Sequence, residues 1–314
     1  MAKEYDYLYD QIVCYGELLS TTIVSEYLND IGITNSWYDA RELVITDTVF
    51  RDASVHWEET EKRIKTKIDT SKTTIVQGFI AGDLNGNTTT LGREGSDFTA
   101  GIFAYCLDAE SLTIWKDVSG ILNADPREFK DPQLLEQISY EETIEMAFYG
   151  ASVIHPKTIK PIQNKKIPLI VRSFKNLNSK GTKVTNKAEM IPNIPCYIVK
   201  KNQVLVSIAS LDFSFIVEEN ISQIFKLFHK YQLKVNLIQN SAISFSVCLD
   251  NNLNHFDQFF NEIKVLYNVS FVKNVDLFTV RHFTENSLSK IYNLGTSLLS
   301  QINKNTAQVI ILKE

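Results

Sequence analysis

Residues 88–100 constrain the fold more than any other stretch of the sequence, because they lie between a predicted strand and a predicted helix. The apolar run 74–80 upstream is typical of a strand, and the run 98–107 has the pattern of a helix. Within residues 88–97, two glycines let the backbone approach a ligand closely, and the first helical turn offers unpaired N–H groups to an anion. The stretch therefore predicts an α/β fold with a ligand-binding loop at residues 88–97.

Two charged side chains indicate what loop 88–97 binds. The guanidinium of Arg93 has the planar geometry that matches a carboxylate or a phosphate, and Asp97 can orient an amine or a metal-bound group. An ordinary capped helix, in which Ser96 and Asp97 satisfy the first turn, explains the same residues without a ligand. The choice between these two interpretations depends on the rest of the sequence.

Four blocks of sequence, in the family's order, resemble the motifs of aspartate kinases in the amino-acid kinase family. They are residues 16–20, 88–97, 115–127 and 148–156. Glu94 stands where that family more commonly has glycine. The resemblance implies an α/β fold, an amino-acid-kinase αβα sandwich, and transfer of the γ-phosphate of ATP to the β-carboxylate of L-aspartate, with Mg²⁺ bridging phosphate oxygens.

The resemblance also assigns roles to individual residues. Asp97 and Arg93 would be catalytic, and Arg93 would bind the substrate together with Glu17, Gly95 and Ser96. Glu17 would contact the amino group of the substrate, although a lone glutamate on a helix is more often a solvated charge.

The same resemblance places the nucleotide near Lys116, Asp117, Arg127, Ser152 and Val153. Lys116 and Asp117 would border the base and ribose, and Arg127 would reach the phosphates. Asp117 could instead cap a helix or form an Asx turn. Ser152 occupies a position where the family commonly has a lysine that faces the nucleotide.

Aspartate kinases begin with a Lys-Phe-Gly-Gly segment whose lysine neutralises the transferring phosphate, and no Lys-x-Gly-Gly occurs here. Phosphoryl transfer depends mostly on positioning and charge neutralisation, so we expect the chain as it stands to be impaired or inactive. The simplest account is a fragment of a longer enzyme. The alternatives are a noncatalytic effector-binding or dimerisation piece of an aspartate kinase, and a different amino-acid kinase.

The pattern changes in the second half of the chain, where predicted strands and helices follow the order βαββαβ of ferredoxin-like modules. The predicted strands are 204–210, 234–238, 243–249 and 270–275, and the predicted helices are 218–231 and 256–267. A strand at 277–282, a helix at 284–303 and a strand at 307–313 would follow. This region resembles one full and one partial ACT unit. We therefore predict an amino-acid kinase domain lacking its first segment (1–175), a linker (176–202) and an ACT regulatory region (203–314).

An ACT region implies an amino-acid effector, lysine or threonine, contacting Ser210, Asn236 and Ser241. Lysine-inhibited members of the family typically have an aspartate where this chain has Asn236, and a glutamate near position 242. A module that only dimerises therefore fits equally well. ACT units commonly pair edge to edge, so we expect a homodimer.

Composition narrows the possible partners and compartments. The net charge of -5 argues against nucleic acid or an anionic membrane as a partner. No apolar run is long enough to span a bilayer, and the polar start is unlike a signal peptide. The four cysteines are scattered without a Cys-x-x-Cys pair, which indicates buried thiols in a reducing compartment. We expect a cytoplasmic protein.

Overall fold

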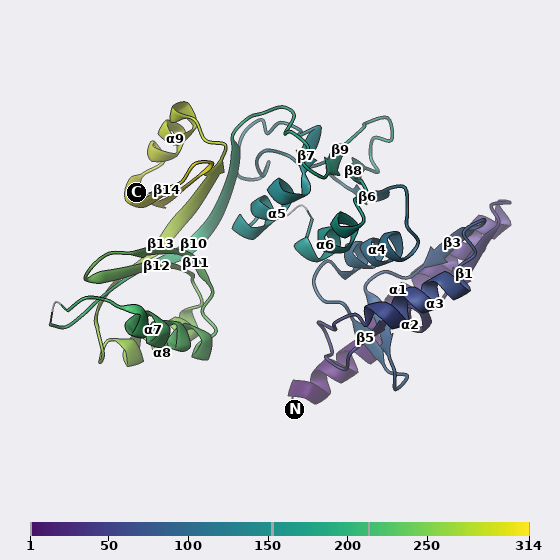
Figure 1. Ribbon diagram of the computed structural model, residues 1–314, viewed down its shortest axis with the longest axis horizontal. Coiled ribbons are helices and arrows are strands. Elements are labelled where there is room, and N and C mark those ends of the chain that lie inside the picture. Colours follow the sequence, from purple (N-terminus) through teal and green to yellow (C-terminus); the bar gives the residue numbers. More distant parts are fainter. Residues whose placement is uncertain (1, 152–153, 213, 314) are drawn as a thin grey trace. The chain divides into compact units, whose positions relative to one another are not determined.

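The computed structural model describes residues 2–151, 154–212 and 214–313 (Figure 1). It divides into two compact units. Unit 1 comprises Met1–Ile121, Leu134–Ala147 and Ser152–Pro192, and unit 2 comprises Leu122–Gln133, Phe148–Ala151 and Asn193–Glu314.

The first part of the chain alternates helices with short strands, as the α/β prediction requires. In the described residues its strands form sheets with the orders β1-β3, β2-β4-β5 and β6-β8-β9-β7. The elements are α1 (Ala2–Asp30), β1 (Asn35–Tyr38), α2 (Ala40–Leu43), β2 (Ile45–Thr46), α3 (Trp57–Lys67), β3 (Thr73–Val76), β4 (Ile80–Asp83), β5 (Thr88–Thr90), α4 (Gly95–Cys106), β6 (Leu112–Lys116), β7 (Gln137–Ser139), α5 (Tyr140–Tyr149), α6 (Pro156–Asn164), β8 (Leu169–Ser173) and β9 (Thr182–Thr185).

In the core of unit 1, α4 packs against α2 and α3 on one side and against α6 on the other. Leu43, Ile64, Leu91 and Ile102 are fully buried in one cluster that joins α2, α3 and α4. On its other side α4 lies beside α6, and the contact is close at Gly101, where a Cβ would lie 2.9 Å from the carbonyl oxygen of Thr158. The helix that begins at loop 88–97 is therefore fixed on two sides.

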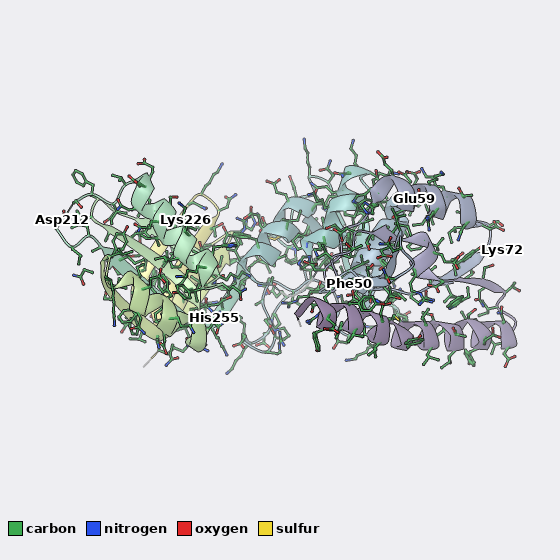
Figure 2. The ribbon with its side chains drawn as sticks, turned by 90° about the horizontal axis from the view of Figure 1, so that it is seen from below. Phe50, Glu59, Lys72, Asp212, Lys226 and His255 are labelled. Carbon is green, nitrogen blue, oxygen red and sulfur yellow. The ribbon has the colours of Figure 1, made fainter. Side chains whose placement is uncertain are left out.

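The long helix α1 buries only one of its faces. Cys14 and Leu18 pack with residues of β4 and α2, whereas apolar side chains on the opposite face are between 49% and 68% exposed. They include Leu8, Ile12, Tyr15, Leu19 and Ile23. Figure 2 shows α1, in purple, with side chains along its length. In the part of the chain that the structure describes, no helix is both long and apolar enough to cross a membrane.

The predicted strand 74–80 is interrupted in the structure. β3 ends at Val76, and Phe79 adopts a left-handed conformation with φ 70°, so the chain turns before β4 begins at Ile80. After this turn, β4 and β5 pair in an antiparallel hairpin. The single strand predicted over 74–80 is therefore wrong at its carboxyl end, because it does not include this turn.

Unit 2 is built on a six-stranded antiparallel sheet with the order β11-β12-β10-β13-β15-β14. Its elements are β10 (Cys196–Ala209), α7 (Glu218–Lys230), β11 (Val235–Asn240), β12 (Ser244–Asp250), α8 (Leu253–Ile263), β13 (Asn268–Arg281), α9 (Glu285–Tyr292), β14 (Thr296–Ile302) and β15 (Thr306–Leu312). The order β10-α7-β11-β12-α8-β13 confirms the predicted ferredoxin-like βαββαβ arrangement.

The two central strands of the sheet, β10 and β13, are long enough to pair with different neighbours along different parts of their length. β10 and β13 have 14 residues each and pair with one another along most of their length. β12 pairs only with residues 203–209 of β10, and β15 pairs only with residues 275–281 of β13. The strands predicted at 270–275 and 277–282 are thus one strand, and the predicted linker 176–202 contains β9 and the beginning of β10.

The helix predicted over residues 284–303 is wrong beyond Tyr292. α9 ends there, and the following residues form β14. Gly295 makes the reversal possible, because a Cβ at this position would lie 2.4 Å from the carbonyl oxygen of Leu312. The apolar and hydroxyl residues that follow fit a helix by composition but pair with β15 in the structure.

All four cysteines are buried. Burial raises the pKa of the thiols of Cys106 and Cys248 to about 12. At pH 8 the thiolate fraction of such a group is about 1 in 10,000. We expect no thiol to react with Ellman's reagent in the folded protein, and all four to react in urea. Fast labelling of a thiol before unfolding would contradict the burial.

Candidate active site

Loop 88–97 is held against the turn between β3 and β4. The backbone N–H of Phe79 donates a hydrogen bond to Oγ1 of Thr99 in α4, at 3.0 Å. A Cβ on Gly78 would lie 2.8 Å from Cβ of Ser96, and a Cβ on Gly95 would lie 2.8 Å from the ring of Phe79. The turn and the helix start approach so closely that both positions require glycine.

The first turn of α4 faces the end of β6. Nζ of Lys116 donates a hydrogen bond to Oδ2 of Asp97 at 2.7 Å, and the two side chains are 28% and 16% exposed. The pair joins a residue predicted to be catalytic with one predicted to border the nucleotide. A partly buried ammonium beside a helix N-terminus is well placed to stabilise an anionic group.

Arg93 precedes α4 and is exposed. Its guanidinium has no hydrogen-bond or ion-pair partner among the described residues. The full set of donors is therefore available to a ligand, which fits the predicted role of binding a carboxylate. Gly95, Ser96 and Asp97 follow directly in the first turn of the helix, so the structure brings these four predicted residues together.

Glu94 is held in an unfavourable conformation. Its backbone is left-handed, with φ 55° and ψ 31°, and its Oε2 is buried without a hydrogen-bond partner in the described structure. We expect Glu94→Gly to raise the free energy of unfolding by about 1 kcal/mol, because glycine adopts this conformation without steric cost. Urea unfolding measures the change. Glu94→Ala keeps the backbone strain and should stabilise less; equal effects of the two substitutions would contradict this explanation.

The turn of α1 that carries Glu17 is fixed to the end of β3. Oγ1 of Thr21 donates to the carbonyl oxygen of Glu17 at 2.8 Å and accepts from Nε2 of Gln77, also at 2.8 Å. Gln77 is fully buried, and its Oε1 accepts from the backbone N–H of Ala40 at 2.7 Å. Gln77 directly precedes Gly78, so it connects the Glu17 turn to the base of loop 88–97.

Gln77 is not among the site residues that the sequence predicts. The available signal was a polar side chain at the end of an apolar strand, and that pattern does not say which backbone or side-chain groups it contacts. Its role in positioning α1 follows only from the hydrogen bonds on both sides of its amide.

The other predicted nucleotide contacts belong to different units of the chain or lie outside the described residues. Asp117 is exposed directly after β6. Arg127 belongs to unit 2, where it forms a 2.6 Å ion pair with Asp125 and is 77% exposed. This hydrogen-bonded pair lowers the pKa of Asp125. Ser152 and Val153 lie outside the described residues.

Among the described residues, no group of three or more His, Cys, Asp or Glu side chains is positioned to hold a metal ion. Proteins usually bind Mg²⁺ through one or two carboxylates together with substrate phosphates, which does not require such a group.

Of the predicted effector contacts, Asn236 makes three hydrogen bonds within unit 2. Nζ of Lys200 donates to its Oδ1 at 2.7 Å, and its Nδ2 donates to Oε1 of Gln203 at 2.7 Å and to Oδ1 of Asp250 at 2.6 Å. Burial lowers the pKa of Lys200. Both N–H donors of the amide are therefore in use, whereas Oδ1 has a second lone pair that can accept a hydrogen bond from an effector.

Ser210 and Ser241 lie in turns of unit 2 and make local contacts. Oγ of Ser210 donates to Oδ1 of Asp212 at 3.0 Å, and Oγ of Ser241 lies 2.8 Å from Oγ of Ser244. Hydrogen bonds from Ser214 and Ser210 lower the pKa of Asp212 to about 2. The role of these serines in effector binding stays a prediction.

Comparisons of sequence and of structure both find similarity to aspartokinases. Residues 2–173 match the model of the amino acid kinase family. Lysine-sensitive aspartokinase 3 of Escherichia coli is 34% identical over 247 residues, which are 77% of this chain and 55% of that protein. The chain thus spans about half the length of this curated relative.

Two solved structures of E. coli aspartokinase III are similar to both units of the chain. The complex with lysine and aspartate, in the T-state, has a TM-score of 0.79 at 26% identity and covers 98% of this chain and 72% of that chain. The complex with aspartate and ADP, in the R-state, has a TM-score of 0.78 with the same identity and coverage.

Proposed function

Because the chain belongs to the amino acid kinase family, we propose that it acts in phosphoryl transfer from ATP to the β-carboxylate of L-aspartate. The products would be 4-phospho-L-aspartate and ADP. The relatives described above are aspartokinases, and one was crystallised with aspartate and ADP. The observation that carries the proposal is the 2.7 Å ion pair of Lys116 and Asp97, in which Asp97 lies in the first turn of α4 and follows Arg93 closely in the sequence.

Some of the proposed site residues would bind the substrate, and others would stabilise the charge that develops on the phosphate. Arg93 would hold a carboxylate of aspartate through paired hydrogen bonds, and Glu17 would bind its amino group. The free β-carboxylate oxygen would then attack the γ-phosphorus as the bond to the ADP oxygen breaks. Mg²⁺ would supply further neutralisation of the phosphate oxygens when it is bound.

We assign Lys116 to the transferring phosphate, in place of the base and ribose. Asp97 holds the ammonium of Lys116 at the start of α4. If Arg93 binds aspartate, negative charge on the transferring phosphate would develop near this position. Asp97 would keep this ammonium in position throughout the reaction. Fixed cations of this kind lower the barrier because they need no reorganisation during transfer.

The test is calorimetric titration of the 314-residue chain with L-aspartate and, separately, with Mg·ATP. We expect both to release or absorb heat in a saturable manner, and ADP formation with both ligands present reports turnover. Lys116→Met should weaken Mg·ATP binding, whereas Lys62→Met, on an exposed face of α3, should not. Binding of lysine or threonine alone, with neither substrate, would overturn the proposal in favour of a regulatory piece.

We further propose that unit 2 is a regulatory module that pairs with a second copy through a sheet edge. Strands β11 and β14 are the outer strands of the six-stranded sheet, and each has one unpaired edge. Such edges readily accept another strand. Sedimentation equilibrium should show a dimer, and a monomer across the whole concentration range would contradict the pairing.

A further inference from the structure

Unit 1 contains a cavity that none of the proposed site residues lines. Its volume is ≈ 500 Å³, and it lies between the segment 52–57, α4 and α6. Phe98 and Tyr105 reach it from α4, and Lys157 and Lys160 reach it from α6. Phe98 directly follows Asp97, and successive residues of a helix point about 100° apart. The cavity is therefore on a different side of α4 from the Lys116 contact.

Three aromatic rings form one wall of the cavity. The ring of Trp57 packs edge-on against Tyr105, with centroids 5.2 Å apart and an interplanar angle of 74°. It also packs against Phe98 at 6.3 Å and 65°. Edge-to-face packing fixes the orientation of such rings, and all three are half-buried. The wall therefore offers a preformed apolar surface that is still accessible.

The charged side chains that line the cavity are Asp52, Lys157 and Lys160, which together carry one more positive than negative charge. Nζ of Lys157 forms an ion pair with Asp52, which also lines the cavity. Lys160, one helical turn later, is exposed and has no hydrogen-bond or ion-pair partner among the described residues. A ligand that enters the cavity thus meets both an aromatic surface and an ammonium group that has no partner among the described residues.

We propose that this cavity binds a small organic acid with a flat apolar body. The aromatic wall of Trp57, Phe98 and Tyr105 takes the apolar body, and Lys160 takes the carboxylate. The volume lies within the range of small-molecule sites, which are mostly apolar with a few placed polar groups. The proposal does not depend on phosphoryl transfer, because its residues are separate from those assigned to aspartate and ATP.

The test uses Trp57 as the reporter. The chain has three tryptophans, so Trp37→Phe with Trp115→Phe leaves Trp57 alone. This variant is titrated with 3-phenylpropionate and with the neutral 3-phenylpropionamide, and the fluorescence of Trp57 is followed. We expect saturable binding, with the carboxylate binding about tenfold more tightly, as one charge-assisted hydrogen bond provides.

Two substitutions then locate the charge. Lys160→Met keeps the apolar stem of the side chain and should bring the carboxylate to the affinity of the amide. Lys62→Met, on α3, should leave the tenfold difference in place. Absence of a saturable fluorescence change, equal binding of the two probes to the parent, or an equal loss in both lysine variants would overturn the proposal.

Discussion

Replacing Arg93 with alanine is expected to weaken L-aspartate binding by about 100-fold, which is the loss that removal of a charged, paired hydrogen bond causes. The guanidinium has no partner among the described residues, so its donors are free for the ligand. For the same reason the folded chain should lose little stability. Calorimetric titration of wild type and variant measures the difference.

Two matched variants separate geometry from charge. Arg93→Lys keeps the charge without the planar fork and should recover only part of the affinity. Arg63→Ala removes an arginine of α3 that is paired with Glu59 at 2.6 Å, and it should leave binding unchanged. An Arg93→Ala variant that binds aspartate as tightly as wild type would remove Arg93 from the site.

Replacing Phe259 with alanine is expected to lower the free energy of unfolding of unit 2 by about 4 kcal/mol. Its side chain is fully buried, and its ring lies 5.1 Å from Phe228 and 6.1 Å from Phe256, centroid to centroid. These rings join α7 to α8 above the sheet, so the cavity left by truncation cannot be filled by a small shift. Urea unfolding followed by far-UV circular dichroism measures the loss.

The fluorescence of tryptophan separates the two units in this experiment, because Trp37, Trp57 and Trp115 all belong to unit 1. The loss at Phe259 should therefore appear in the circular dichroism of unit 2. Phe225→Ala is the control, because this ring is 38% exposed, and it should cost much less. Equal destabilisation by the two substitutions would show that burial of Phe259 does not determine the stability of the unit.

Much of the architecture could be predicted because its signals are local. The alternation of apolar strands with amphipathic helices after residue 203 was sufficient for the βαββαβ order, which the structure confirms. The strand-loop-helix pattern around residues 88–100 likewise placed Arg93 and Asp97 next to a helix start. In both regions the pattern needed only residues that are close in the sequence.

Features that depend on distant residues were not predictable in the same way. The β4–β5 hairpin requires the left-handed turn at Phe79, and nothing in the local sequence marks an aromatic residue for that conformation. The end of α9 depends on Gly295 lying against Leu312. The ion pair of Lys116 and Asp97 joins residues that are 19 positions apart, so the composition of either segment alone does not reveal it.

The continuous central strands of unit 2 have a mechanical consequence. β10 and β13 run through both halves of the sheet, the half that contains β11 and β12 and the half that contains β14 and β15. Neither half therefore has a complete set of strands of its own. A proteolytic cut between α8 and β13 would release no self-sufficient fragment, because one product would retain only β10 and the other only β13. We therefore expect the sheet to deform as one unit. A change in strand twist at the β11 edge should also change the twist of β15 and β14, because β10 and β13 connect the two edges.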